Sequence, residues 1–541
     1  MTAASLPGAE QAPSFANAAE CKAWLAAAPL TDAPQMMAAF MRELKAINRS
    51  ALPAGDRLDI LELLRGPVYE TQEGFSRRFI GKLQPMAALE QSAYEASGAV
   101  WHSLVTGYMR CAEACFANDA QVKPRAALVL ERALAALVAE QAGTHRVSRT
   151  PSGEHWRILH QIYATAEQLG VTDQEVVDTP HHGKLRATPK AVYVEALLLG
   201  VSNLHEHSQR QIDWVSRWAR RWAPKVKVMA SAPEFSSQAI PLCVDLGSDA
   251  PAGYKPFPGP GARWLDTVDL RHSLKKRLVL LAQGEPPAKL HLGDDCTQPA
   301  CEEVLNLAYH RWCKGAAVRS AERRPASGPC RFIAGFEGIH YYVGGRKPLK
   351  QLMPKDSRML AREAEEIATF GRVATHRDEH FSEQKGYAVE EWETLENWHM
   401  VNTSSAGMRI ARPVGQNGVR LALRQLVAVS PADTQDWLLG CVRWTLVEDS
   451  FEIGLHFFAG KPEAIALRGA GLASASEVFK PGFLVPAVPA IKQDPSLVMP
   501  VGIFKQNRVL DIYTDGKPGR VRLTHLVERG ADFERSAYEP A

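Results

Sequence analysis

The stretch Asn402-Thr403-Ser404-Ser405-Ala406-Gly407 decides how the C-terminal part of this chain is interpreted. It reads N-x-S-x-x-G, and alternating apolar and polar residues stand on both sides of it. Asparagine and serine side chains bond to nearby backbone groups in tight turns, and glycine adopts backbone angles that residues with a Cβ resist. The stretch is therefore predicted to form the turn between two antiparallel strands.

Short strands are predicted after this turn. Apolar and polar residues alternate in the segments 419–424, 437–444 and 451–457, and turn residues separate these segments. Closely spaced short strands are typical of a small antiparallel barrel, whose closure removes exposed strand edges. We expect such a barrel over residues 386–470, followed by a small accessory β-rich module over 471–541.

The hexapeptide and the strands after it resemble the PilZ family of bacterial cyclic-di-GMP receptors. The resemblance covers residues 386–470, and Asn402, Ser404 and Gly407 match the family signature [D/N]-x-S-x-x-G in residue type and spacing. It implies a six-stranded barrel, cyclic-di-GMP as the ligand, and those three residues in the binding turn. It also implies a binding protein rather than an enzyme.

The PilZ family also carries an R-x-x-x-R arm ahead of its first barrel strand. Arg358 and Arg362 have this spacing, but they precede Asn402 by at least 40 residues. Arg372 and Arg377 stand closer to the turn, with one residue more between them. Arginine pairs bidentately with phosphate, or with guanine O6 and N7. Both pairs are therefore candidates for a cationic arm that contacts the nucleotide.

Two functions are compatible with this pattern, because the hexapeptide by itself is also an ordinary turn. The first is a cyclic-di-GMP effector that relays nucleotide binding to an unknown protein partner through its helical domain. The second is an interaction scaffold whose barrel no longer binds the nucleotide. Trp398 and Trp444 are candidates for stacking on guanine, although the alternation of Trp444 with Val442 favours core packing for Trp444.

The N-terminal half follows a helical pattern. Apolar residues recur every three or four positions over 19–224, after a tail over 1–18 whose composition predicts disorder. Trp214, Trp218 and Trp222 share one face of the last predicted helix. These tryptophans either stack on nucleic acid beside neighbouring arginines or lie buried in the core. Their core-like spacing favours burial, so a nucleic-acid partner is not expected.

The middle of the chain mixes strand and helix patterns. We expect a mixed α/β domain over 225–345, with a β-pair over 332–343 and His340 as a hydrogen-bonded sheet histidine, followed by a linker over 346–385 that carries the arginine arm. Four residues of this region are candidate zinc ligands, but their spacing disfavours a zinc site. They are Cys296, Cys301, His310 and Cys313. The predicted fold class is therefore multidomain α+β.

Composition excludes several classes of protein. The chain has 541 residues, a net charge of +3 and 46% hydrophobic residues, which is typical of soluble multidomain proteins. The sequence lacks phosphate-loop, nucleophile-elbow and zinc-protease motifs, so neither catalysis nor a metal or other cofactor is expected. We find no signal peptide and no apolar run of roughly 20 residues, and therefore expect a cytoplasmic location. Nine scattered cysteines do not predict a disulfide framework.

Overall fold

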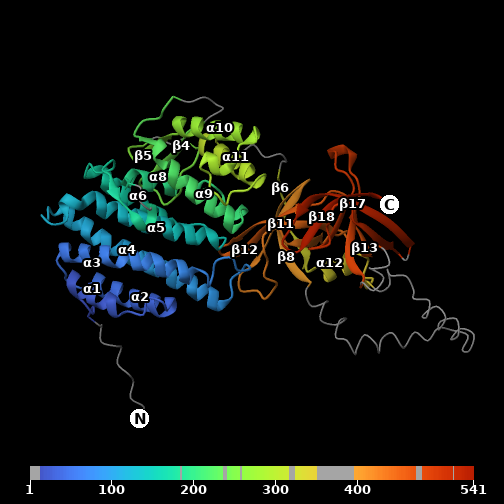
Figure 1. Ribbon diagram of the computed structural model, residues 1–541, viewed down its shortest axis with the longest axis horizontal. Helices are drawn as coiled ribbons and strands as arrows, with labels where there is room; N and C mark the ends of the chain where they lie inside the picture. Colours follow the sequence, from blue (N-terminus) through green and yellow to red (C-terminus); the bar gives the residue numbers. More distant parts are fainter. Residues whose placement is uncertain are drawn as a thin grey trace, which may run out of the picture. The chain divides into compact units, whose positions relative to one another are not determined.

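The computed structural model describes residues 12–182, 186–234, 240–255, 259–315, 323–349, 395–470, 478–515 and 517–541. The chain divides into two compact units. Unit 1 comprises Met1–Lys82 and Met86–Val318, and unit 2 comprises Leu83–Pro85 and Arg319–Ala541. In Figure 1, unit 1 runs from blue to yellow and unit 2 from yellow to red. Helices dominate unit 1 and strands dominate unit 2, which confirms the predicted multidomain α+β class.

Long helices build most of unit 1 and bury one face each in a common core. Several begin at side chains that accept a hydrogen bond from the first turn, among them Asn17, Ser152 and Ser208. No helix in the described part of the chain is long and apolar enough to cross a membrane. The helices are α1 (Ala18–Ala27), α2 (Ala33–Arg49), α3 (Ala54–Ser76), α4 (Ala88–Phe116), α5 (Ala126–Arg146), α6 (Gly153–Gln168), α7 (Thr179–His182), α8 (Pro189–Gly200) and α9 (Gln209–Trp222).

The segment before α1 packs against these helices. Phe15 is buried, and its ring centroid lies 5.3 Å from that of Trp24. Ser14 donates hydrogen bonds to Glu43 from its backbone nitrogen (2.8 Å) and its hydroxyl (3.0 Å). The disorder predicted over 1–18 is therefore wrong for residues 12–18, because an aromatic side chain here enters the core. The residues before 12 lie outside the described part.

A small sheet and two further helices complete unit 1. The strands β3 (Lys227–Met229), β5 (Ala262–Asp266) and β4 (Leu242–Asp245) pair antiparallel in that order. The helices α10 (Val268–Ala282) and α11 (Ala300–Cys313) follow, and their buried side chains join the core of the preceding helices. Residues of the mixed region predicted over 225–345 thus fall in both units.

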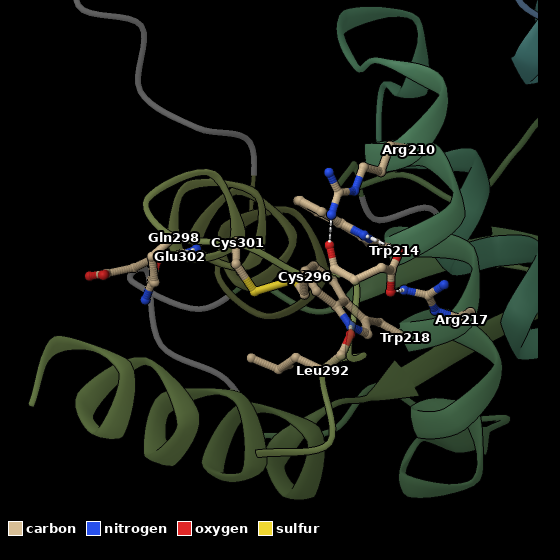
Figure 2. The surroundings of a disulfide bond; sticks show 10 residues. Arg210, Trp214, Arg217, Trp218, Leu292, Cys296, Gln298, Cys301 and Glu302 are labelled. Carbon is tan, nitrogen blue, oxygen red and sulfur yellow. Dashed lines mark hydrogen bonds and ion pairs between the residues drawn. A yellow bond between two sulfur atoms is a disulfide. The ribbon is translucent and has the colours of Figure 1, made fainter. Parts of the chain in front are cut away.

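The three tryptophans of α9 are buried, so the burial interpretation holds and they offer no stacking surface. Figure 2 shows Trp214 and Trp218 beside a loop ahead of α11. Trp214 Nε1 donates to Asp295 Oδ2 at 2.8 Å, and Trp218 Nε1 donates to the Leu292 carbonyl at 2.9 Å. Arg217 pairs with Asp295 at the edge of the stripe. The arginines of α9 therefore lie beside a row of tryptophans that faces the core.

A disulfide closes this same loop. Cys296 and Cys301, five residues apart, are bonded to each other. The sequence did not predict a disulfide, and the bond leaves only His310 and Cys313 of the four residues weighed for zinc. Among the described residues, no group of three or more His, Cys, Asp or Glu side chains is arranged to hold a metal.

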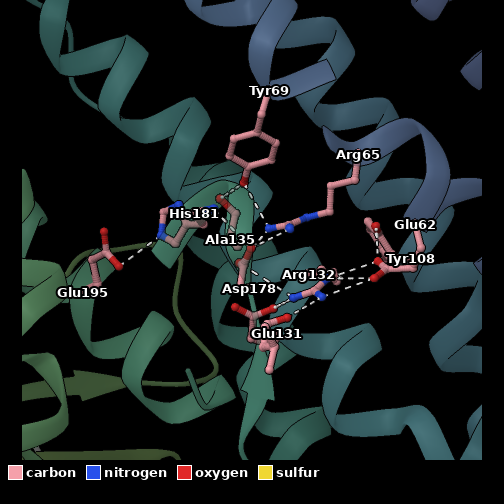
Figure 3. Close-up of polar contacts among 11 residues, drawn as sticks. Glu62, Arg65, Tyr69, Tyr108, Glu131, Arg132, Ala135, Asp178, His181 and Glu195 are labelled. Atoms are coloured by element: carbon pink, nitrogen blue, oxygen red, sulfur yellow. Dashed lines mark hydrogen bonds and ion pairs between the residues drawn. The ribbon is translucent and has the colours of Figure 1, made fainter. Parts of the chain in front are cut away.

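A cluster of charges joins α3, α5 and Asp178, the residue before α7 (Figure 3). Arg65 donates two hydrogen bonds to Asp178, at 2.6 and 2.7 Å, and both side chains are buried. Arg132 binds Glu131 at 2.6 Å and Glu62 at 3.1 Å. A bidentate arginine–carboxylate pair is strong, and removing one partner of a buried pair costs about 3–5 kcal/mol. The cluster therefore holds three distant segments of the helical unit together.

Glu131 is a member of this cluster whose pKa lies far from its ordinary value. Burial, together with the negative charge of Asp178, raises the pKa of Glu131 to about 8 in spite of Arg132. Burial would also raise the pKa of Asp178, but the hydrogen bonds and charge of Arg65 outweigh it and hold that pKa below its usual range. The two carboxyl groups thus hold one proton between them at neutral pH.

Glu131→Gln should remove a pH dependence of stability. The pKa of Glu131 is about 8 in the folded chain, against about 4.3 when it is unfolded. Between these values the folded state holds the extra proton, so the free energy of unfolding falls as pH rises, by at most about 1.4 kcal/mol per unit. Urea unfolding between these two pKa values should show a flatter profile for Glu131→Gln than for the wild type. Glu95→Gln, at an exposed position of α4, is the control, and equal slopes for all three proteins would contradict the assignment.

The first half of unit 2 is an antiparallel barrel, as the alternating pattern predicted. Its strands pair in the order β6-β8-β7-β10-β11-β12-β9, and β8 also pairs with β9, which closes the ring. Both β6 and β7 pair with β8, so they act as one interrupted strand. The strands are β6 (Arg324–Pro325), β7 (Pro329–Ala334), β8 (Glu396–Ser404), β9 (Gly407–Pro413), β10 (Leu426–Pro431), β11 (Leu438–Val447) and β12 (Ser450–Phe457).

The β-pair predicted over 332–343 is wrong in its second half. The first strand exists as β7, but Phe336–Val343 forms the helix α12. Gly335 has a φ of 93°, which ends the strand, and Ile339 and Tyr342 are then buried at helical spacing. His340 is buried on this helix rather than in a sheet, with its Nε2 3.0 Å from the Ile465 carbonyl oxygen.

The accessory region is a second closed barrel. Its strand order is β13-β14-β15-β18-β17-β16, with a core of its own. A further apolar cluster contains Leu426 of the first barrel, Phe483 of the second and Ile339 of α12, so the two barrels share buried side chains. The strands are β13 (Glu463–Gly469), β14 (Lys480–Val485), β15 (Ser496–Pro500), β16 (Val509–Thr514), β17 (Lys517–Arg529) and β18 (Phe533–Pro540).

Candidate functional site

The N-x-S-x-x-G stretch forms a tight hairpin between β8 and β9, as predicted. Ser404 pairs with Gly407 across the ladder, and the Ser404 hydroxyl donates to the Gly407 carbonyl at 3.3 Å. Ser405 and Ala406 alone make the connection and are exposed. Asn402 therefore lies on strand β8, two pairs beyond the closing pair Ser404–Gly407, instead of in the turn itself.

Gly407 is required because the next strand approaches closely. A Cβ at this position would lie 2.1 Å from the Leu455 carbonyl oxygen of β12. Its backbone is not in the left-handed region, so the conformational reason expected from the sequence does not apply. Glycine is needed here for space, which allows β9 and β12 to pair next to the turn.

Four residues form a row across the outer face of the barrel. Asn402 pairs with Arg409, Arg409 with Gly454, and Gly454 with Trp444, on the successive strands β8, β9, β12 and β11. Directly paired residues project from the same face of a sheet. The neighbours of Arg409 and Gly454 along their strands are core residues, so the row faces outward.

Trp444 lies over Gly454 and is only partly buried. A Cβ on Gly454 would lie 1.9 Å from the indole nitrogen, so the absence of a side chain there makes room for the ring. The Arg409 guanidinium carbon lies 5.7 Å from the centre of that ring, and Arg409 Nε donates to Glu452 at 2.8 Å. The ion pair with Glu452 thus restrains a cation–π contact at the barrel surface.

The predicted roles of the two tryptophans are reversed. The register shifts between Val442 and Trp444, and this bulge takes Trp444 out of the buried alternation that was expected for it. Trp398 is buried in the barrel core, where its ring lies 5.0 Å from Phe332, so it is unable to stack on a ligand. Trp444 is therefore the stacking candidate of the pair.

Asn402 carries an unsatisfied acceptor. Its Oδ1 is buried and has no hydrogen-bond donor among the described residues. Leaving a buried acceptor unpaired costs about 1–3 kcal/mol. Nearby, burial and the charge of Arg443 lower the pKa of His456, which pairs with Gly407, so His456 adds no positive charge at neutral pH. The row thus offers an acceptor, a cation and an aromatic ring to a ligand.

The four predicted arm residues, Arg358, Arg362, Arg372 and Arg377, lie outside the described residues. The structure instead brings other arginines to the hairpin. Arg324 of β6 pairs with Thr403 of β8, beside the pair Pro325–Asn402, and both Arg323 and Arg324 are exposed.

A sequence signal for these arginines was available. Arg319 and Arg323 have the R-x-x-x-R spacing and directly precede the first barrel strand. This signal was missed because the barrel was expected to begin at residue 386. Of the two, only Arg323 belongs to the described part of the chain.

The fold and site define a class: a helical unit joined to two small barrels, with a polar and aromatic row beside a signature hairpin. Residues 19–233 match the family model described as "Cyclic-di-GMP receptor FimW, N-terminal domain", and residues 465–541 match "FimW C-terminal beta-barrel domain". These matches confirm the predicted resemblance to cyclic-di-GMP receptors. Neither match carries the PilZ name or covers the first barrel.

The match to one curated relative extends over nearly the whole chain. The chain is 21% identical, over 558 aligned positions, to the cyclic-di-GMP receptor FimW of Pseudomonas aeruginosa. The alignment covers 96% of this chain and 90% of the relative. The first barrel, with its candidate site, lies between the two segments that the family models match.

Gly407→Ala should destabilise unit 2. The added methyl group would press on the Leu455 carbonyl, and overpacking of this kind costs about 1–3 kcal/mol. We expect the thermal transition of the barrels to shift to lower temperature in differential scanning calorimetry. Gly415→Ala, whose added methyl group would meet open space, should leave the transition unchanged. Equal transitions for both variants would show that β12 does not approach as closely as described.

Proposed function

We propose that this chain is a cyclic-di-GMP effector that binds the nucleotide on the outer face of its first barrel. The observation that carries the proposal is the unpaired Asn402 Oδ1, which lies in one row with Arg409 and Trp444 beside the hairpin. The name of the P. aeruginosa relative, a cyclic-di-GMP receptor, supports the same ligand. The proposal includes no catalysis and retains the predicted cytoplasmic location.

The chemistry of the ligand fits these side chains. Cyclic-di-GMP has two phosphates and two guanine bases. Asn402 Oδ1 would accept a hydrogen bond from a guanine N–H and so regain the partner it lacks. The indole of Trp444 would stack on a base, an interaction worth about 1–3 kcal/mol. The Ser404 hydroxyl would bond to phosphate or to a base edge, at the start of the turn.

The arginines supply the charge that two phosphates require. Arg323 and Arg324 stand next to Asn402 and Thr403 through the pairing of β6 with β8, so we propose them as cationic contacts. Arg358 with Arg362, and Arg372 with Arg377, remain the candidates that the sequence motif suggests. The described geometry favours Arg323 and Arg324, because Arg324 lies on the strand that adjoins the hairpin and Arg323 directly precedes that strand.

We further propose that nucleotide binding is relayed to a protein partner through the helical unit. In the alternative, a scaffold with a barrel that has lost the nucleotide, the outer row would have no ligand to satisfy Asn402. The buried unpaired acceptor favours the effector over the scaffold.

Ser404→Ala should weaken cyclic-di-GMP binding by at least about tenfold. Loss of a hydrogen bond to a charged group costs about 1.5–3 kcal/mol. Isothermal titration calorimetry of the full-length protein, with GTP as a control ligand, measures this. Ser405→Ala, at the exposed connection next door, should bind like the wild type. Absence of binding to the wild type would support the scaffold, and unchanged affinity in Ser404→Ala would remove the hairpin from the site.

Replacing Arg323 and Arg324 together by alanine should reduce the affinity more than replacing Arg358 and Arg362. The first pair adjoins the hairpin through β6, and each lost charged contact costs about 1.5–3 kcal/mol. The same calorimetric titration compares the two double variants. If only the Arg358/Arg362 variant lost affinity, the cationic arm would be the one that the sequence motif suggested.

A further inference from the structure

Arg409 stands between two hydrogen-bond acceptors on the outer face of the first barrel. On one side its direct partner across the ladder is Asn402 of β8. On the other side it pairs with Gly454 of β12, and Glu452 lies two residues before Gly454, on the same face of that strand. The guanidinium of Arg409 therefore has a possible partner on each neighbouring strand.

The structure shows Arg409 turned toward β12. Its Nε donates to Glu452 Oε2 at 2.8 Å, and its Nη2 donates to the same oxygen. The carboxylate is fixed in turn, because its other oxygen accepts from the Ser450 hydroxyl at 3.3 Å. A guanidinium binds a carboxylate more strongly than it binds a neutral amide, which explains why Arg409 turns to Glu452.

This orientation places Arg409 against Trp444. The guanidinium carbon lies 5.7 Å from the centre of the indole ring, and the missing side chain of Gly454 leaves the room between the two strands. A cation over an aromatic face is attracted to it, so Arg409 restrains the ring that is proposed to stack on a base.

The same orientation leaves Asn402 without a donor. Its Oδ1 is buried and unpaired among the described residues. Arg409 is nevertheless its direct partner, and the Cβ atoms of such a pair lie about 4.5–5.5 Å apart, within reach of an arginine side chain. The ion pair with Glu452 is therefore what draws the nearest cationic donor away from this acceptor.

We infer that Glu452 is a positioning residue of the nucleotide site. It holds Arg409 toward β12 and so keeps Asn402 Oδ1 open for a guanine N–H. Without Glu452, Arg409 would turn to its partner on β8 and bond to that oxygen, and a base would have to displace it. The inference rests on the proposed function, in which guanine takes this acceptor.

The charge of Glu452 alone would have the opposite effect. A carboxylate repels a ligand with two phosphates, so its removal would tighten binding if Glu452 acted only through its charge. Removal would also tighten binding if a phosphate had to displace Glu452 from Arg409. Positioning predicts weaker binding instead, so the sign of the change in affinity separates these roles.

The test compares Glu452→Ala with Glu452→Gln by calorimetric titration of the full-length protein with cyclic-di-GMP. Both variants lose the same charge, but glutamine keeps an oxygen that accepts from Arg409. We expect Glu452→Ala to weaken binding at least about tenfold, because the base must then break a hydrogen bond from a charged donor. Glu452→Gln should retain most of the wild-type affinity.

A second background shows whether Glu452 acts through Arg409. In Arg409→Met, the further change Glu452→Ala should cause no additional loss of affinity. A loss caused by misfolding would persist in this background. Asp511→Ala is the matched control, because Asp511 is 18% exposed and accepts from Arg520 at 3.0 Å on the second barrel, and this variant should bind like the wild type.

The outcomes separate this inference from the proposed function. Equal or tighter binding by Glu452→Ala, equal affinities of the alanine and glutamine variants, or an undiminished loss in the Arg409→Met background would overturn the inference while the proposed function stands. Absence of cyclic-di-GMP binding to the wild type would overturn both.

Discussion

Pairing of β8 with β9 is the interaction on which unit 2 depends. It closes the first barrel and so removes the two strand edges that an open sheet would expose. Closure demands the close approach of β12 at Gly407, and it brings Asn402 into one outer row with Trp444, although 41 residues separate them in the sequence. The hairpin thus both closes the barrel and forms the base of the candidate site.

Both units combine apolar cores with buried ion pairs. Unit 1 combines a continuous apolar core with buried ionic contacts, and in that cluster Arg65 and Asp178 connect segments more than 100 residues apart. Unit 2 also has a buried ion pair, Arg412 with Glu396, and it joins two barrels through a shared apolar cluster that includes α12. The second barrel is therefore packed against the site-bearing barrel as part of one compact unit.

Local pattern predicted the features that local physics controls. The alternation of apolar and polar residues around Asn402 predicted the hairpin. The recurrence of apolar residues every three or four positions predicted the helices of the N-terminal half. Both patterns depend only on residues close together in the sequence. The first barrel strand was missed because β7 pairs with β8 across more than 60 residues, and such pairing leaves little trace in either segment. Trp444 was misplaced by one bulge, which reverses the face of every residue after it. The loop disulfide likewise depended on a tertiary position that the cysteine spacing did not reveal.

Hydrogen–deuterium exchange of the full-length protein, with and without saturating cyclic-di-GMP, tests the central claim most directly, since it reports where a ligand slows local opening. The account predicts slower exchange in the hairpin of β8 and β9 and in β11 around Trp444. It also predicts unchanged exchange in the strands of the second barrel that are remote from the first. Protection confined to the second barrel or to unit 1, with the hairpin unaffected, would contradict it.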